Sequence, residues 1–401
     1  MENYSYSSIK NIIFVLGTGR SGSTLLRSLL DGHPELVVWP FEFSYYSLFE
    51  DKWGVIGSNE VLEFDALLDY FLFKLNMFSS NFSGDLGQHT YLIENFNNES
   101  FFSNLNASKG IRCTRSEFLK ILLFSYYHAS HVIENSKPPK AFIIVHNQPA
   151  SAILDDFFDA KLIAMIRDPI ETYYSNKAYY FKACENTGRD KSSVFRPYKA
   201  NKRFRSLLET SISPIIHTYN WFHINLKGQD SYNIYLEDLR NDACKVMTGL
   251  CNFIGIEFID SCLNATFLGQ VHHSNMSSGK KTYGNVVPQD SELKKNLRPK
   301  SFEYYWIYKN LYLVYDNSPK LLQRYSMGEL SSKFNIIDFL KPMENEFPTK
   351  GSDKLEARKL KLFIVLRVAR YLGFIISYCV NRHVFLTLNY QKILKSWPMA
   401  K

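Results

Sequence analysis

The sequence has few cysteines for its length, and none of them form a closely spaced pair. Six cysteines are spread over 401 residues, at Cys113, Cys184, Cys244, Cys251, Cys262 and Cys379. Zinc sites and redox motifs are typically built on C-x-x-C spacing, and small secreted domains are rich in disulfides. The pattern therefore favours reduced thiols in a cytosolic protein over a disulfide framework or a zinc site.

The N-terminus lacks the features of a secretory leader. The segment MENYSYSSIKN has no basic region ahead of a long apolar stretch. The apolar run from Ile12 to Leu16 is too short for a signal peptide or a membrane anchor. We therefore expect a cytoplasmic protein.

The first 350 residues carry no excess of either charge. Residues 351–401 hold ten Lys and Arg against two acidic residues, so the tail carries the whole net charge of +8. Within it, Leu362 to Val380 is nearly long enough to span a bilayer, but Arg367 and Arg370 near its middle each cost roughly 2.5–3.5 kcal/mol. We expect this helix to lie on an anionic membrane surface, at the inner face of the membrane, or to pack on the preceding domain.

The sequence does contain a glycine-rich turn between a predicted strand and a predicted helix. Ile12 to Leu16 has the length and composition of a strand buried on both faces. From Ser23 to Leu30 the apolar residues recur at helical spacing. Gly17 to Gly22 therefore precedes a helix N-terminus, where unpaired N–H groups and the helix dipole favour anions.

Aligned with the phosphate-loop pattern G-x4-G-K-[ST], this turn lacks the lysine. Gly17, Gly22 and Thr24 match, but Ser23 stands in the lysine position. Since that lysine serves the β- and γ-phosphates of a nucleoside triphosphate, its absence argues against a triphosphate ligand. Arg20 supplies a cation inside the loop, and a guanidinium can hold one phosphate-like group in a bidentate fork.

The segment GTGRSGSTLL, the DGHP that follows it and the glutamate of WPFE, Glu42, together resemble the sulfotransferase family. Its members use 3′-phosphoadenosine 5′-phosphosulfate (PAPS) as sulfuryl donor and release adenosine 3′,5′-bisphosphate (PAP). The resemblance implies a P-loop-like, doubly wound α/β fold with a central parallel β-sheet flanked by helices. It also implies that the loop embraces the 5′-phosphosulfate, through Thr18, Gly19, Arg20, Ser21, Gly22, Ser23 and Thr24.

A second signature lies in KLIAMIRDPIETYYSNKAYY, from Lys161 to Tyr180. Leu162 to Ile166 predicts a buried strand, and Pro169 favours the first turn of the next helix. Arg167 and Ser175 are eight residues apart, which matches the spacing by which the family holds the 3′-phosphate of the donor. Ordinary nucleotides lack that phosphate, so this signature is specific.

Glu42 follows a second apolar run, Leu36 to Val38, which suits a strand neighbouring the first. In an open α/β sheet, ligands bind outside the carboxyl ends of the strands, so we expect Glu42 and the glycine-rich loop to face one cleft. From there a carboxylate can take the proton from an acceptor hydroxyl. The alternative for this residue is a solvated carboxylate in a β-to-α loop.

One position departs from the family. Related sulfotransferases commonly have a lysine two residues before the proline that follows another predicted strand, Phe142 to Val145, and here that position is Asn147. In the family this lysine helps to neutralise the sulfuryl group. The departure leaves open which cation replaces it.

Other segments carry weaker signals. Residues 44–135 are largely helical by spacing, with an irregular stretch from Ser79 to Lys109. Lys182 to Arg205 holds eight basic residues against two acidic ones, which suits a lid over the donor, a dock for an acidic acceptor or a solvated loop. Asn233 to Phe258 resembles the Y-E-D-L segment that completes the family's core. His272 to Gly284 resembles the loop that closes over the donor's 3′-phosphate and adenine.

The sequence thus predicts a sulfotransferase domain over residues 10–320 and a mostly helical extension over residues 321–401. We expect transfer of the sulfuryl group from PAPS to a hydroxyl or amine of a carbohydrate, lipid or other compound, with Glu42 as general base and Arg20 stabilising the departing phosphate. No metal and no nucleic acid are expected to take part. Two alternatives stay open: a nucleoside or nucleotide kinase, and a membrane-associated binding protein with a degenerate donor site.

Overall fold

The computed structural model describes residues 5–42, 49, 52–54, 56–81, 97–130, 138–146, 149, 151–186, 198–200, 203–205, 207–267, 269–271, 273–275, 281–283 and 324. The chain divides into two compact units. The first comprises residues 1–176 and 214–291, and the second comprises residues 177–213 and 292–401. The candidate site described below lies entirely within the first unit.

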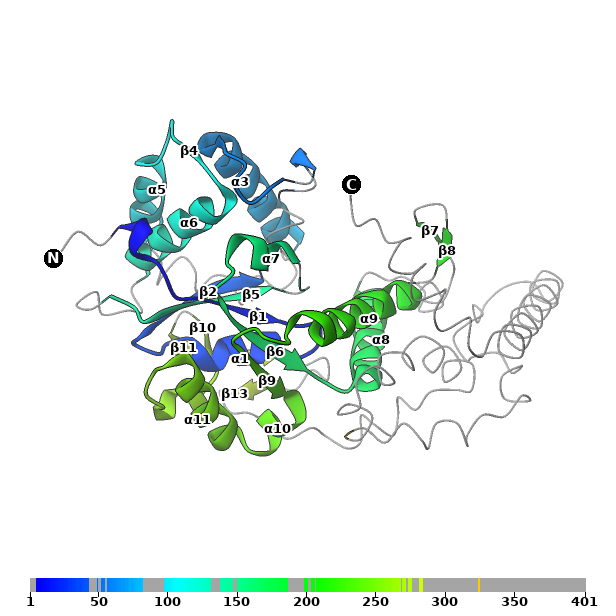
Figure 1. Ribbon diagram of the computed structural model, residues 1–401. Helices are drawn as coiled ribbons and strands as arrows, with labels where there is room; N and C mark the ends of the chain where they lie inside the picture. The colour runs from blue at the N-terminus through cyan, green and yellow to red at the C-terminus, as the bar shows by residue number, and fades with distance from the viewer. Residues whose placement is uncertain are drawn as a thin grey trace, which may run out of the picture. The chain divides into compact units, whose positions relative to one another are not determined.

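The first unit is built on a five-stranded parallel sheet, shown at the centre of Figure 1. The strands lie in the order β2-β5-β1-β6-β9. Their bounds are Ile12–Leu16 for β1, Leu36–Glu42 for β2, Ala141–His146 for β5, Lys161–Ile166 for β6 and Ser231–Tyr235 for β9. This sheet confirms the predicted α/β class.

The position of β2 differs from the expectation that it neighbours β1. Strand β5 lies between them and pairs with both, and β2 is an edge strand. The reason is visible in the residues of the two strands. Pro40 within β2 has no N–H to give to a second neighbour, which confines the strand to an edge, whereas β5 is buried along its whole length and suits the interior.

Helices cover both faces of the sheet. In Figure 1, α3, α5 and α6 lie on one face, and α1 and α11 lie on the opposite face. The helix bounds are Ser23–Leu30 for α1, Phe64–Asn81 for α3, Asn98–Asn106 for α5, Arg115–Ala129 for α6, Ser151–Asp156 for α7, Pro169–Asn186 for α8, Leu207–Asn225 for α9, Leu236–Asn241 for α10 and Ala243–Ile254 for α11, with single 3₁₀ turns at Tyr6–Ser8 (η1) and Asp260–Leu263 (η4).

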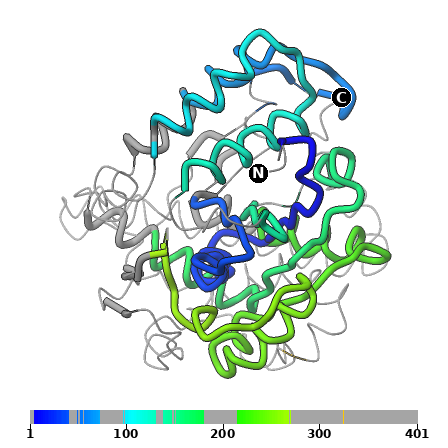
Figure 2. The backbone as a smooth tube through the Cα atoms, turned by 90° about the vertical axis from the view of Figure 1, so that its left-hand side faces the viewer, coloured from blue at the N-terminus to red at the C-terminus, as the bar shows by residue number. Residues whose placement is uncertain are grey.

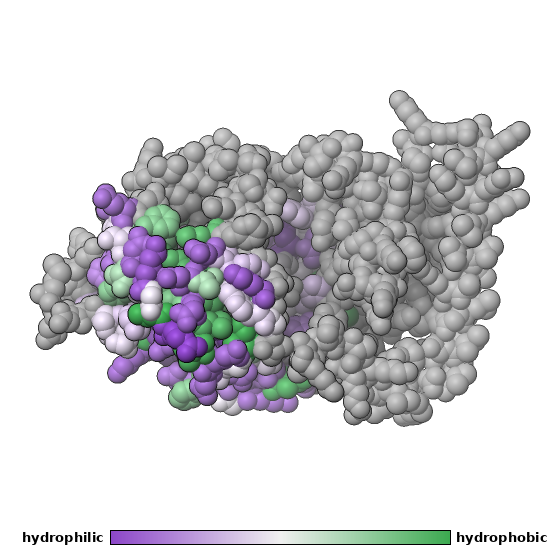
Figure 3. Space-filling view, turned by 90° about the horizontal axis from the view of Figure 1, so that it is seen from above, coloured by the Kyte–Doolittle hydropathy of each residue, from purple (hydrophilic) through white to green (hydrophobic). Residues whose placement is uncertain are grey.

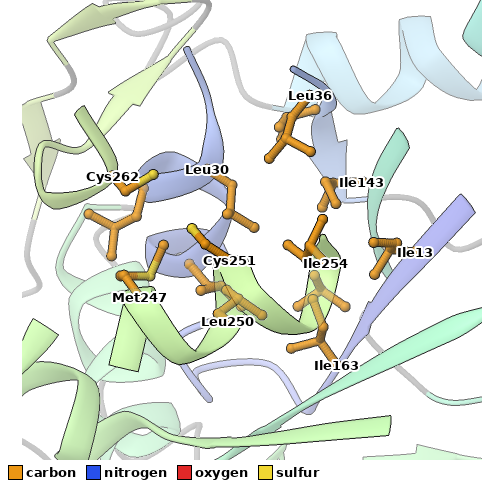
Figure 4. Packing of buried hydrophobic residues seen from close by; sticks show 14 of the residues in the cluster. Ile13, Leu30, Leu36, Ile143, Ile163, Met247, Leu250, Cys251, Ile254 and Cys262 are labelled. Atoms are coloured by element: carbon orange, nitrogen blue, oxygen red, sulfur yellow. The ribbon is translucent and has the colours of Figure 1, made fainter. Parts of the chain in front are cut away.

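A cluster of buried apolar residues fills the space between the sheet, α1 and α11. Alternate residues of each strand point into it, as a period of two requires, and the leucines of α1 meet them from the other side. Figure 4 shows part of the cluster and labels ten of its members: Ile13, Leu30, Leu36, Ile143, Ile163, Met247, Leu250, Cys251, Ile254 and Cys262. On the opposite face of β1, Phe14 packs against Phe157, with ring centroids 5.4 Å apart. Both faces of β1 are therefore buried, as its apolar run predicts.

The stretch predicted to be irregular, Ser79 to Lys109, contains the helix α5. The Asn97 side chain caps it by accepting a hydrogen bond from Ser100 N at 2.9 Å. Phe101 and Leu105, one turn apart, are buried. The prediction was wrong here because asparagine was counted only as a loop former, although it is also among the best N-caps.

Short antiparallel pairs complete the described chain. In the first unit they are β3 (Leu62–Glu63) with β4 (Arg112–Cys113), β10 (Thr266–Phe267) with β11 (Gln270–Val271), and β12 (His273–Asn275) with β13 (Lys281–Tyr283). The second unit contains β7 (Tyr198–Ala200) paired with β8 (Arg203–Arg205). Seen from above, the described surface mixes hydrophilic and hydrophobic residues (Figure 3).

Among the described helices, none is long and apolar enough to cross a membrane. The predicted tail helix, Leu362 to Val380, lies outside the described residues. The expected domain boundary near residue 320 also falls there, so both stay predictions.

Candidate functional site

The loop after β1 folds tightly over its own first residue. Ser21 N donates to Thr18 O at 3.1 Å, and both side chains are almost fully buried. A Cβ on Gly17 would lie 2.4 Å from Ser21 Oγ and 3.2 Å from Met165 Cβ. Glycine at position 17 therefore leaves room for the Ser21 hydroxyl.

Two residues of this loop have left-handed backbone conformations. Gly22, the N-cap of α1, has φ 98°, and Arg20 has φ 71°. Arg20 is the only non-glycine residue in the described part of the chain with a positive φ. These two residues turn the chain from the end of β1 into α1, so that the N-terminus of the helix follows the strand within six residues.

Ser23 and Thr24 occupy the first turn of α1, as the sequence predicts. Ser23, in the position of the phosphate-loop lysine, is buried, and Thr24 is exposed. Because Ser23 is short and buried, it cannot extend a charge toward a ligand as the lysine does.

The loop after β6 is held by a buried tyrosine. The Tyr219 hydroxyl accepts from Arg167 N at 3.2 Å and donates to Arg167 O. Tyr219 and Arg167 are both buried. Tyr219 is absent from the sequence-based prediction because it lies 52 residues away in α9 and belongs to no motif.

The Arg167 guanidinium reaches the glycine-rich loop. Its Nη1 donates to Arg20 O at 2.9 Å, and its Nη2 lies 3.9 Å from Glu171 Oε2. Burial lowers the pKa of Arg167, and the nearby carboxylates of Glu171, Glu237 and Asp168 oppose that shift. Arg167 thus belongs to the second signature and also holds the backbone of the loop after β1 through Arg20 O.

Helix α10, which directly follows β9, contributes Glu237 to the same edge of the sheet. Ile166 and Tyr235 are in register, so the residues that follow β6 and β9 meet there. Asp168 N donates to Glu237 Oε1 at 3.2 Å. Glu237 lies in the first turn of α10, where acidic residues stabilise a helix.

A third guanidinium lies close to this cluster. Burial and the charge of Arg167 lower the pKa of Arg240 to about 10, and Glu237 and Glu171 oppose the shift. Cations and carboxylates therefore alternate along the edge where β6 and β9 end.

The side chains of the two predicted signatures meet at Arg20. Its Nε donates to Ser175 Oγ at 3.2 Å. With the bond from Arg167 to Arg20 O, the structure links the loop after β1 to Arg167 and Ser175 through two hydrogen bonds. Residues more than 145 positions apart in sequence are thereby brought into one site.

Glu42 is the last residue of β2 and pairs with Val145 of β5. It therefore lies within the strand, where the sequence placed it just beyond, and at the edge of the sheet where β1 and β5 also end. The Glu42 side chain and Asn147 lie outside what the structure describes, as do residues 276–280 of the predicted closing loop and most of the basic segment between Lys182 and Arg205.

The site contains buried donors that the described protein does not satisfy. Ser21 Oγ and Arg167 Nε have no hydrogen-bond partner among the described residues. Above the loop, a Cβ on Gly19 would meet nothing within 4 Å. An open approach, left-handed glycine and unpaired donors beside a helix N-terminus fit a phosphate-bearing group. The described residues contain no cluster of three or more His, Cys, Asp or Glu arranged to hold a metal ion.

Solved structures offer distant similarities. The sulfotransferase domain of the Synechococcus PCC 7002 olefin synthase is 21% identical over 74% of this chain and 91% of that one, with a TM-score of 0.40. The sulfotransferase domain from the curacin biosynthetic pathway is 14% identical over 79% and 98%, with a TM-score of 0.41. A sulfotransferase from Alicyclobacillus acidocaldarius is 13% identical over 76% and 94%, with a TM-score of 0.39.

Comparison with curated proteins gives no match. The profile of the sulfotransferase domain matches residues 10–303, which include the sheet, both signatures and every residue of the site described above. This match covers well over half of the chain, and so the protein belongs to the sulfotransferase domain family.

Proposed function

We propose that this protein transfers the sulfuryl group of PAPS to a hydroxyl or amine of an acceptor. The observation that carries the proposal is the hydrogen bond from Arg20 Nε to Ser175 Oγ at 3.2 Å. This bond connects the loop after β1, which is suited to bind one phosphate, with Ser175 of the second signature, which is suited to bind another. A donor that has phosphate groups at both its 5′ and 3′ positions matches this two-part site, and PAP, the product, presents the same two groups.

The loop after β1 would hold the 5′ end of the donor. Residues Thr18 to Thr24 supply backbone N–H groups at a helix N-terminus, and Arg20 supplies a positive charge. When the bond between sulfur and the 5′-phosphate oxygen breaks, negative charge gathers on that oxygen. Arg20 and the loop amides would stabilise this charge without a metal ion. Arg167 and Ser175 would bind the 3′-phosphate.

Glu42 would act as general base at the end of β2. The acceptor oxygen or nitrogen forms a bond to sulfur as the bond to the 5′-phosphate breaks, and the proton of the acceptor passes to the Glu42 carboxylate. Glu42→Gln keeps the shape and removes the proton acceptor. We expect kcat to fall by roughly 10²- to 10⁴-fold while PAP still binds. Normal turnover by this variant would move the base elsewhere, with His146, buried at the end of β5, the first residue to test.

Calorimetry separates this function from a kinase. The protein should bind PAP, bind adenosine 5′-monophosphate more weakly, and show no preference for ATP with magnesium. Tighter binding of ATP with magnesium would favour the kinase, although the short and buried Ser23 opposes it.

Turnover separates an enzyme from a binding protein. Incubation with ³⁵S-labelled PAPS and an extract of the source cells, followed by fractionation, should give a labelled carbohydrate, lipid or other hydroxyl compound. Arg112→Ala is a suitable control variant because Arg112 forms an exposed ion pair with Glu63, 3.1 Å apart, in the β3–β4 pair. Binding of PAP without any labelled product would support a degenerate donor site.

We also propose that the protein is cytoplasmic and associates peripherally with the inner membrane surface through its basic tail. Full-length protein should sediment with vesicles of anionic lipid and be released by salt, since each basic residue near such a surface contributes roughly 1 kcal/mol. Truncation after Gly351 should abolish sedimentation and leave PAP binding intact. Retention in high salt would instead indicate a membrane span.

A further inference from the structure

Strand β2 is irregular immediately before Glu42. Its register with β5 shifts between Val38 and Glu42, and Pro40 lies inside the shift. Proline gives no N–H to a ladder, and β2 is an edge strand, so the sheet alone holds this part of the chain weakly. Something else must fix the strand end that carries Glu42.

Arg27, in the middle of α1, supplies that contact. Its Nη1 donates to Pro40 O, the carbonyl at the irregularity and two residues before Glu42. The Arg27 side chain is buried, with 7% of its surface exposed. A charged donor to a buried carbonyl is a stronger bond than one between neutral groups. Arg27 therefore ties the end of β2 to the helix that begins at the glycine-rich loop.

The arginine is itself held in place from the other side. Its Cζ lies 5.3 Å from the centre of the Phe267 ring. Asp31, one helical turn after Arg27, compensates its charge, and Asp31 Oδ2 accepts from Gly269 N at 2.8 Å and from Thr266 Oγ1 at 2.9 Å. Figure 2 shows the blue chain of α1 beside the yellow-green chain around residues 266–271. The contacts leave the guanidinium little freedom to move away from Pro40.

We propose that Arg27 is a positioning residue for sulfuryl transfer: it fixes the backbone at the end of β2, the strand that carries Glu42. The inference rests on the proposed role of Glu42 as general base. The same helix presents the donor loop at its N-terminus and holds the strand of the base from its middle. The donor loop and the strand that carries the base are thereby both held by α1, and Arg27 acts on the base through the backbone of β2.

A double-mutant cycle tests this proposal. Arg27→Met should lower kcat by about tenfold or more, because small displacements of a catalytic group are costly, and should leave the dissociation constant of PAP within about threefold. In the Glu42→Gln background the same change should alter kcat by less than about twofold, because no base remains to be positioned. Arg27→Lys, which keeps the charge and one donor, should recover part of the activity.

The results of this cycle separate the positioning role of Arg27 from the general-base role of Glu42. Normal activity of Glu42→Gln alone would overturn the role of Glu42. Suppose instead that Glu42→Gln has low activity and that Arg27→Met lowers kcat by the same factor with and without Glu42→Gln. That result would support Glu42 as the base and overturn the positioning role of Arg27. If Arg27→Met does not fold, Arg27→Lys carries the same cycle, with the same two readings. Arg112→Met is the matched control: Arg112 also donates to a backbone carbonyl, Val61 O at 3.1 Å, but is exposed and should leave kcat unchanged.

Discussion

The loops after β1 and β6 meet at one site but are built in different ways. The first is made largely of glycine and backbone, and its cation, Arg20, is exposed. The second centres on Arg167, which is buried and bonded to Tyr219, to Glu171 and to the first loop. An exposed cation on a tight loop is suited to meeting a ligand, whereas a buried and multiply bonded one also supports the fold. Substitutions in the two loops should therefore separate activity from stability.

The largest effect should come from removing Arg167. Arg167→Ala removes a buried cation from beside the half-buried carboxylates of Glu237 and Asp168 and leaves Arg20 O without its donor, so we expect a loss of about 3 kcal/mol in the free energy of unfolding. Urea denaturation measures it. If the folded fraction binds PAP far more weakly while its affinity for adenosine 5′-monophosphate changes little, Arg167 also binds the 3′-phosphate. Equal losses for both ligands would limit Arg167 to supporting the fold.

Arg20→Ala should lower activity strongly and stability only slightly. We expect kcat to fall by roughly 10²-fold, as when a transition-state donor is removed, which corresponds to about 2.7 kcal/mol. The free energy of unfolding should change by no more than about 0.5 kcal/mol, as for an exposed side chain. Activity within a few-fold of the unchanged protein would refute the role of Arg20 and remove the contrast between the loops.

Tyr219→Phe tests the second loop without touching any charge. The ring stays in place, but the backbone N–H and C=O of Arg167 both lose their partner. Leaving buried backbone groups unpaired costs about 1–3 kcal/mol, so thermal and urea unfolding should both register the loss. Phe222, a neighbouring aromatic residue whose ring centroid lies 6.2 Å from that of Tyr219, offers the control Phe222→Leu. Equal stability of Tyr219→Phe and the unchanged protein would show that the hydroxyl does not hold the loop.

The smallest effect concerns Asp31, at the far end of the helix that the first loop begins. Burial raises the pKa of Asp31 above its ordinary value of 3.8, and the bonds from Gly269 and Thr266 only partly oppose this. A raised folded-state pKa means that the contribution of Asp31 to stability is complete below about pH 3.8 and is lost as the pH rises through the folded-state value. An asparagine at this position does not titrate, so the Asp31→Asn variant does not lose stability in this way as the pH rises. Its stability relative to the unchanged protein should therefore improve as the pH rises from 4 toward 8, which urea denaturation at a series of pH values measures.

Sequence patterns predicted the elements that have strong local signals. The apolar run of β1, the helical spacing of α1 and the turn at Pro169 are all found where they were expected. Each depends on residues within about ten positions of one another, where composition and periodicity carry the information.

What the sequence did not reveal depends on contacts between distant segments. The place of β5 between β1 and β2 is decided by which strand tolerates burial on both sides, and the role of Tyr219 is decided by a bond across 52 residues. Arg27 belongs to no sequence motif, and only its bond to Pro40 O connects it with β2. The spacing of Arg167 and Ser175 indicated a shared ligand, but not that Arg20 would link to both.

The left-handed conformation of Arg20 has a consequence for how this protein can evolve or be engineered. At φ 71° a residue with a side chain costs roughly 1–2 kcal/mol that glycine does not, so Arg20→Gly would relax the loop while removing its cation. A screen for thermal stability alone would therefore select against the cation that we propose stabilises the departing phosphate. In that role, arginine at this position exchanges stability for activity, and stabilised variants of this protein are best sought away from the six residues between β1 and α1.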